Sequence, residues 1–87
     1  MRMTLKQLQN KVEYINELSG TPKQPYNNRV SQINCYYIGQ AYGGYRLEQI
    51  SNKSGGAKDI SDRLTARELS YFLNGMITGL EQAKGMR

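Results

Sequence analysis

Residues 39–47 read GQAYGGYRL, in which two glycines separate two tyrosines. Adjacent glycines allow the positive φ angles that both central positions of a type I′ turn require. We therefore expect Gly43 and Gly44 to form the turn of a β-hairpin, with Tyr42 facing Tyr45. A phosphate-binding glycine loop would instead connect a strand to a helix. Here a second strand-like run follows, so the context favours the hairpin.

Strand-like runs lie on both sides of this turn. Residues 30–39 (VSQINCYYIG) and residues 45–51 (YRLEQIS) are rich in β-branched and aromatic side chains, which favour strands. Neither run has a clean polar face, so the pattern leaves the pairing register open. A short third strand around residues 58–61 is a weaker alternative.

The N-terminal segment predicts a helix. Thr4 and Gln7 have the spacing of a capping box. Apolar residues then recur at helical spacing and predict one buried face, at Leu5, Leu8, Val12, Ile15 and Leu18. Gly20 is placed to end this helix in the left-handed conformation. Residues 21–29 (TPKQPYNNR) contain both prolines and two asparagines, and we expect them to form a loop.

The C-terminal segment predicts a second helix. Thr65 and Glu68 form another capping-box pattern, followed by a broad apolar face at Leu69, Phe72, Leu73, Met76, Ile77 and Leu80. Gly75 and Gly79 lie four residues apart, and each costs up to about 1 kcal/mol of helix stability relative to alanine. We expect the backbone of another element to pack closely against these two glycines.

The predicted order is helix, strand, strand, an optional third strand, helix. This order indicates an α+β fold, in which a two- or three-stranded antiparallel sheet carries both helices on one face. At 87 residues, we expect one small domain spanning residues 1–87. No apolar run is long enough for a membrane span, and the first residues lack the apolar core of a signal peptide. We therefore expect a cytoplasmic protein that does not enter a membrane.

Several groups used in catalysis are missing from the chain. It has no histidine and one cysteine, Cys35, which lies in a strand-like apolar run. Histidine is the commonest general base near neutral pH, and we expect Cys35 to be a small buried side chain. No Cys/His cluster has zinc-ligand spacing. The sequence predicts no catalytic residue, no metal site, no cofactor and no enzymatic activity.

The positive charge is concentrated in a window that lacks acidic residues. The net charge is +5, and no acidic residue occurs between Glu17 and Glu48. Five of the seven tyrosines fall in this window, where they could stack on bases while the cations attract phosphate. A solvated basic loop beside a tyrosine-rich sheet is the simpler interpretation. The candidate binding residues are Lys23, Arg29, Tyr42, Tyr45 and Arg46.

Two functional hypotheses follow from these residues. The first is a non-enzymatic binding module that contacts another protein, because tyrosine and arginine are enriched at interface hot spots. The alternative is nucleic-acid or nucleotide binding through the basic, tyrosine-rich region 18–47. Self-association as a homodimer is a further alternative, because a short sheet has an unpaired edge.

The second glycine pair, within SGGA at residues 54–57, leaves two structures open. A plain surface turn is the simpler one. The alternative is a nest of backbone amides that binds an anion beside Lys53 and Lys58.

The segments QAYGGYRL, SGG and TARELSYFLNGMITGL, together with the first helix, resemble a family of small proteins carried by bacteriophages and mobile elements of gut bacteria. The similarity covers nearly the whole chain. It implies an α+β fold and a mobile-element origin, but no particular activity. If the chain comes from such an element, the binding-module hypothesis has a host or viral protein as its partner. The predicted element order also resembles the double-stranded-RNA-binding domain, whose last helix begins with a lysine cluster. Residues 65–68 here read TARE, so most of that phosphate clamp is absent.

Overall fold

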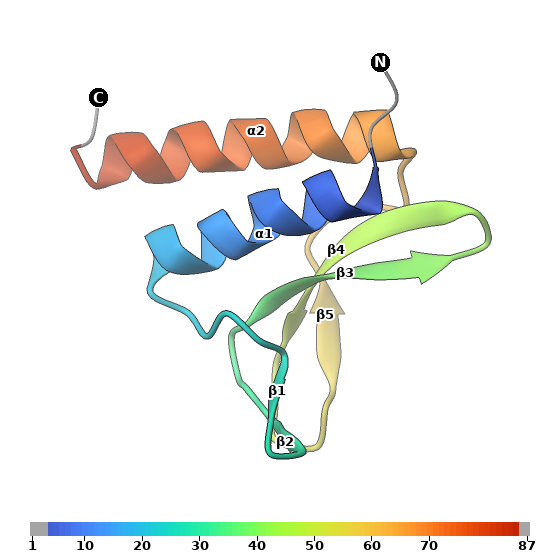
Figure 1. Ribbon diagram of the computed structural model, residues 1–87, viewed down its shortest axis with the longest axis vertical. Coiled ribbons are helices and arrows are strands. Elements are labelled where there is room, and N and C mark those ends of the chain that lie inside the picture. The colour runs from blue at the N-terminus through green and yellow to red at the C-terminus, as the bar shows by residue number, and fades with distance from the viewer. Residues whose placement is uncertain (1–3, 86–87) are drawn as a thin grey trace.

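The computed structural model describes residues 4–85 and has an α+β fold with the element order α-β-β-β-β-β-α (Figure 1). Its elements are α1 (Leu5–Ser19), β1 (Tyr26–Asn27), β2 (Val30–Ser31), β3 (Tyr36–Ala41), β4 (Gly44–Ile50), β5 (Ala57–Asp59) and α2 (Ala66–Ala83). Strands β3, β4 and β5 form an antiparallel sheet in that order, and β1 and β2 form a separate hairpin. The predicted α+β class is confirmed. Across residues 4–85, neither helix has the length and apolarity needed to cross a bilayer.

Both helices begin as their sequences predict. At α1, the Thr4 hydroxyl accepts a hydrogen bond from the Gln7 amide at 3.2 Å, and the Gln7 side chain accepts one from the Thr4 amide at 2.8 Å. Thr65 and Glu68 form the same capping box at α2. Gly20 ends α1 in the left-handed conformation, with a φ of 71°. These reciprocal bonds satisfy amides that a helix N-terminus leaves unpaired.

The turn between β3 and β4 lies one residue earlier than expected. Its central residues are Tyr42 and Gly43, whose φ angles are 52° and 76°. The strand position after them belongs to Gly44, which pairs with the last residue of β3, and Tyr45 pairs with Gln40. The prediction that Gly43 and Gly44 form the turn, with Tyr42 facing Tyr45, is therefore wrong.

Packing on both faces of the sheet explains the observed register. In this register Ile38 lies opposite Leu47, whereas the expected register would have placed the polar Gln40 opposite that buried leucine. Gly44 also sits where a Cβ atom would collide with the Arg63 side chain. The second glycine is therefore needed for close packing in the strand, and the first supplies the positive φ of the turn.

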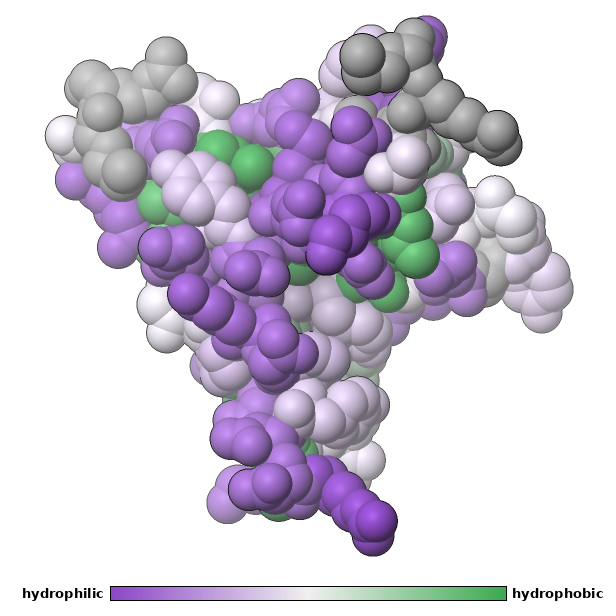
Figure 2. Space-filling model, in the orientation of Figure 1, coloured by the Kyte–Doolittle hydropathy of each residue, from purple (hydrophilic) through white to green (hydrophobic). Residues whose placement is uncertain are grey.

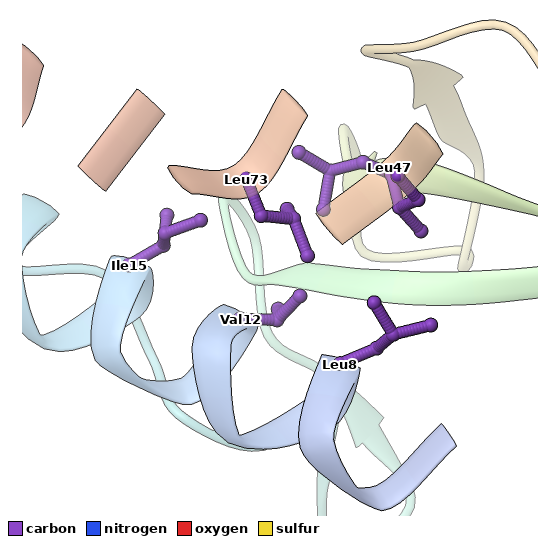
Figure 3. Packing of buried hydrophobic residues seen from close by; sticks show 6 residues of the cluster. Leu8, Val12, Ile15, Leu47 and Leu73 are labelled. Atoms are coloured by element: carbon purple, nitrogen blue, oxygen red, sulfur yellow. The ribbon is translucent and has the colours of Figure 1, made fainter. Parts of the chain in front are cut away.

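The helices pack side by side on one face of the sheet and run in the same direction (Figure 1). Lys11 Nζ donates to Asn74 Oδ1, and the Tyr14 hydroxyl donates to Glu81 Oε2, both at 2.8 Å. Beneath these bonds lies the core, which consists of Leu8, Val12, Ile15, Leu47, Leu69 and Leu73 (Figure 3). The side chains of β3 and β4 that complete it are Tyr36, Ile38 and Tyr45.

The segment expected to be a loop contains the β1–β2 hairpin. Its turn is formed by Asn28 and Arg29, with φ angles of 52° and 66°. Asn34, with a φ of 75°, separates β2 from β3, so the expected continuous strand over residues 30–39 is interrupted. Asparagine tolerates the left-handed region better than most residues. Asn28 therefore allows the turn between β1 and β2, and Asn34 allows the break between β2 and β3.

Among residues 4–85, Gly75 and Gly79 do not contact the backbone of another element. Both are exposed, and within this range a Cβ atom built at either position would have no atom of another element within 4 Å. The expectation of a close contact is therefore wrong. The buried leucines of α2, Leu69 and Leu73, lie on a different side of the helix and make the contacts with the core.

The SGGA loop is a plain turn. Asn52 Oδ1 accepts hydrogen bonds from the amides of Ser54 and Gly56, at 2.9 and 3.0 Å. The Asn52 side chain therefore fills the position that an anion would take in a nest of amides.

Candidate functional site

The five predicted binding residues lie in three separate places. Tyr42, Tyr45 and Arg46 are together on the β3–β4 hairpin, Lys23 is in the loop that follows α1, and Arg29 is in the β1–β2 turn. These two hairpins project from different parts of the molecule (Figure 1). The acid-free region of the sequence therefore does not fold into one continuous basic surface.

Tyr42 is the most unusual of these residues. Its side chain is 93% exposed, and its φ of 52° lies in the region that bulky residues rarely adopt. The guanidinium carbon of Arg63 lies 5.4 Å from the centre of its ring, within range of a cation–π interaction. In Figure 2 this hairpin, at the right, is paler than the strongly hydrophilic surface over the middle of the molecule.

Arg63 reaches the hairpin through the chain that connects β5 to α2. The backbones of Tyr45 and Leu64 exchange hydrogen bonds of 2.8 and 2.7 Å, which hold residues 60–65 against the start of β4. The Arg63 side chain then lies over Gly44. No motif in the sequence signals this contact.

Together these residues line a small depression of about 100 Å³, which we call the tip site. It is formed by two glycines, two tyrosines and two arginines, namely Gly39, Gly44, Tyr42, Tyr45, Arg46 and Arg63. Tyr45 is half-buried and packs against the core from the face of the helices. It anchors the site, and Tyr42 is the aromatic side chain that a partner can reach.

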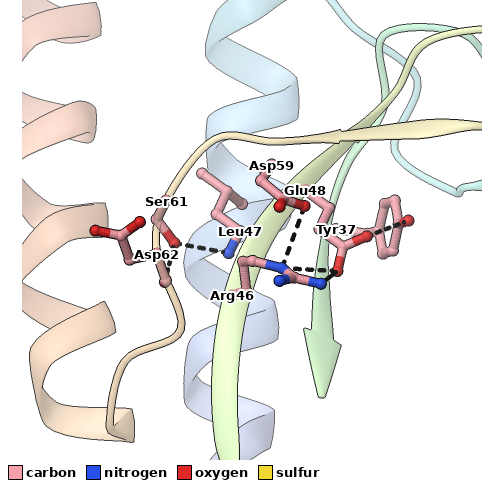
Figure 4. A network of polar contacts seen from close by, with 7 residues as sticks. All are labelled: Tyr37, Arg46, Leu47, Glu48, Asp59, Ser61 and Asp62. Carbon is pink, nitrogen blue, oxygen red and sulfur yellow. Dashed lines mark hydrogen bonds and ion pairs between the residues drawn. The ribbon is translucent and has the colours of Figure 1, made fainter. Parts of the chain in front are cut away.

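The two arginines of the tip site differ in their partners. Arg46 forms ion pairs with Asp59 at 3.2 Å and with Glu48 at 3.3 Å (Figure 4). Among residues 4–85, no acidic side chain pairs with Arg63. Arg63 is therefore the cation of the tip site that can meet a carboxylate of a partner, although the sequence pointed to Arg46.

Tyr37 completes the polar network on the open face of the sheet. Its hydroxyl donates to Glu48 Oε1 at 2.8 Å (Figure 4). Burial, together with this hydrogen bond, raises the pKa of Tyr37 to about 12. Gly39 makes room for the network, because a Cβ atom there would collide with the Glu48 carboxylate.

Residues 4–85 contain little that resembles a reactive centre. Within this range, no three acidic or cysteine side chains gather as the ligands of a metal ion would. Cys35 is fully buried, as predicted, and burial raises the pKa of its thiol. The tip site can supply aromatic contacts, hydrogen bonds and one positive charge, which are the means of binding.

The chain has no significant match to any family model, curated protein or solved structure with which it was compared.

Proposed function

We propose that this protein is a non-enzymatic binding module that contacts another protein through the tip site. One observation carries the proposal, namely that a fully exposed tyrosine occupies the first central position of a type I′ turn. Asparagine is preferred at that position because it tolerates a positive φ. Residues that break a local structural rule concentrate at functional sites.

The contact would have an aromatic centre and a charged margin. Tyr42 can insert its ring into an apolar pocket of the partner, as tyrosines do at interface hot spots. Beside it, Arg63 can pair with a carboxylate of the partner. Such a pair at the rim of an interface mainly favours the correct orientation and a fast encounter.

The setting of this contact is part of the proposal. The resemblance to small proteins of phages and mobile elements suggests a mobile-element origin, and we propose a host or viral protein as the partner. In a reducing cytoplasm the single cysteine would stay a thiol. Its burial is compatible with that environment.

Nucleic-acid binding is the alternative that the same residues support. The cation–π pair of Tyr42 and Arg63 offers a surface on which a base could stack. Two observations favour a protein partner. Lys23 and Arg29 lie away from the tip site, and the charge of Arg46 is balanced by two carboxylates.

Fluorescence anisotropy with labelled single- and double-stranded oligonucleotides, measured across a salt series, separates these two functions. Phosphate contacts weaken steeply as salt rises. Micromolar binding at low salt that is lost in R63A would favour the nucleic-acid function over the protein contact.

Affinity capture from host extract then tests the protein contact. Y42N should lose a partner that the wild type retains. Y71N is the matched control, because Tyr71 is 66% exposed on α2, outside the tip site. If Y42N captures the partner as well as Y71N does, the tip site is not the contact surface.

A further inference from the structure

We propose that the free edge of β3 binds an extended peptide segment carrying an acidic side chain, which adds to the sheet as a further strand. This site is separate from the tip site. Strand addition at a sheet edge is a common mode of peptide recognition, in which backbone hydrogen bonds provide affinity.

The side chain of Asn16 already forms the first contacts that such a strand would make. β3 is an edge strand of the sheet. The Tyr36 amide donates to Asn16 Oδ1 at 2.8 Å, and Asn16 Nδ2 donates to the Tyr36 carbonyl at 2.9 Å. The backbone polar groups of Tyr36 therefore point away from β4, towards the free edge.

The alternation of a strand extends this direction to the next residues. Backbone groups of every second residue point to the same side of an antiparallel strand, so those of Ile38 and Gln40 also point to the free edge. Within residues 4–85, neither is hydrogen bonded to another element on that side. These two residues offer two donors and two acceptors to an incoming strand.

A groove gives access to this edge. It has a volume of about 360 Å³, with α1 on one side and residues 23–25 on the other, within the range of about 300–1,000 Å³ that is usual for ligand sites. Tyr36 packs towards the helices and Tyr37 lies on the open face of the sheet. Because both of them line the groove, the groove straddles the edge of β3.

The charges around the groove favour an acidic segment. Lys6 and Lys23 line it from α1 and from the loop, and Glu13 is the single acidic residue among the groove's lining residues. Both lysines are exposed, and among residues 4–85 neither forms an ion pair, so within this range they can move towards a carboxylate without breaking one. Lys23, predicted to act with the tyrosines of the hairpin, belongs to this groove instead.

A single extended segment fits this groove better than a second copy of the chain does. A second β3 strand would bring its own α1, which contacts β3 along the same edge. In an isologous pair, the two copies of α1 would approach the same space. A peptide brings no such element.

Selection from a random heptapeptide phage library at low salt, with the full chain as bait, provides a probe of this site. We expect enriched peptides to contain Asp or Glu. One enriched peptide is then synthesised with a fluorescent label, and its fluorescence anisotropy during titration with the protein gives its affinity. Binding should weaken at least about tenfold in K6E/K23E. K53E/K58E, which changes the net charge equally at exposed positions outside the groove, should stay within about twofold of the wild type.

Amide hydrogen exchange measured by NMR identifies the backbone contacts. On binding of the peptide, the backbone amides of Ile38 and Gln40 should gain protection from exchange. The backbone amide of Tyr71, on α2 and outside the groove, should not change. The proposal is overturned if no peptide is enriched, if the protected amides belong to the tip site instead, or if the two double variants lose equal affinity. Dimerisation that protects these same amides without peptide would also overturn it, in favour of self-association. None of these results depends on whether Tyr42 contacts a partner.

Discussion

Asn16 of α1 and Tyr36 of β3 pair through two hydrogen bonds, in which a side-chain amide takes the place of a neighbouring strand. Asn16 is 1% exposed, and its oxygen also accepts a hydrogen bond of 2.7 Å from the Thr21 hydroxyl. One polar residue thus joins the first helix, the loop after it and the sheet edge. Buried polar networks of this kind fix a unique arrangement when every member is satisfied.

Asn16→Ala should therefore lower the free energy of unfolding by about 2–3 kcal/mol, because it leaves the amide and carbonyl of Tyr36 without their partner. Urea unfolding followed by circular dichroism measures this change. Asn10→Ala is the control, since Asn10 is exposed on the same helix and alanine favours helix. Equal stability of the two variants would show that the Asn16 amide is not needed to hold α1 on the edge of β3.

Gly75→Ala and Gly79→Ala should each raise the free energy of unfolding, by up to about 1 kcal/mol. Both positions lie in the interior of α2, and no atom of another element in residues 4–85 lies within 4 Å of a Cβ atom built there. The added methyl group therefore meets none of these atoms, and the helix gains from the better propensity of alanine. Thermal melting of the single variants measures the effect. A loss of stability would mean that another backbone does pack against these glycines.

Tyr37 should make stability fall at high pH. Burial and the hydrogen bond to Glu48 raise its pKa from 10.0 to about 12 on folding. The protonated phenol therefore contributes its full share of stability below about pH 10, where it is protonated in both states. Between about pH 10 and 12 the unfolded state releases this proton first, and the contribution is lost. Tyr37→Phe should remove this part of the pH dependence, as measured by urea unfolding across that range. An unchanged slope would contradict the assignment of the high pKa to Tyr37.

Gly39→Ala should disturb the same network without changing Tyr37 itself. Its Cβ atom would displace the Glu48 carboxylate from Arg46 and from the Tyr37 hydroxyl, which should lower the pKa of Tyr37. Absorbance of tyrosinate at alkaline pH follows this change, with Tyr37→Phe identifying the residue. Gly43→Ala serves as the control, because it strains a φ of 76° but leaves Glu48 untouched. A drop in the tyrosine pKa with Gly43→Ala alone would contradict this origin.

The parts of the fold that follow local rules could be predicted from the sequence. Both capping boxes, the glycine that ends α1 and the buried Cys35 depend on neighbouring residues or on local hydrophobicity. The hairpin was found but its register was not, because the register depends on Leu47 meeting Ile38 beneath the helices and on Arg63 packing over Gly44. The helices that cover Ile38 and Leu47, and Arg63 itself, all lie far from this hairpin in sequence.

The candidate site was predictable only in part, for the same reason. Tyr42, Tyr45 and Arg46 were grouped correctly because they are neighbours on one hairpin. Lys23 was placed with them because the sequence lacks acids there, and the fold instead places it beside α1. The two carboxylates that balance Arg46 come from the same strand and from β5. A charge pattern along the chain does not reveal which charges pair in space.

Tyr42→Asn should separate stability from function. Asparagine adopts the positive φ of this turn position more readily than tyrosine, so the hairpin should gain a few tenths of a kcal/mol to about 1 kcal/mol. Tyr42 is exposed and makes its ring contact with Arg63 alone among residues 4–85, so little packing is lost. The melting temperature should therefore rise while capture of the partner falls. Tyr42→Phe keeps the ring and the strain, and it should change neither property much. If Tyr42→Asn lowered the melting temperature, the tyrosine would be stabilising the turn, and its exposure would no longer argue for a partner.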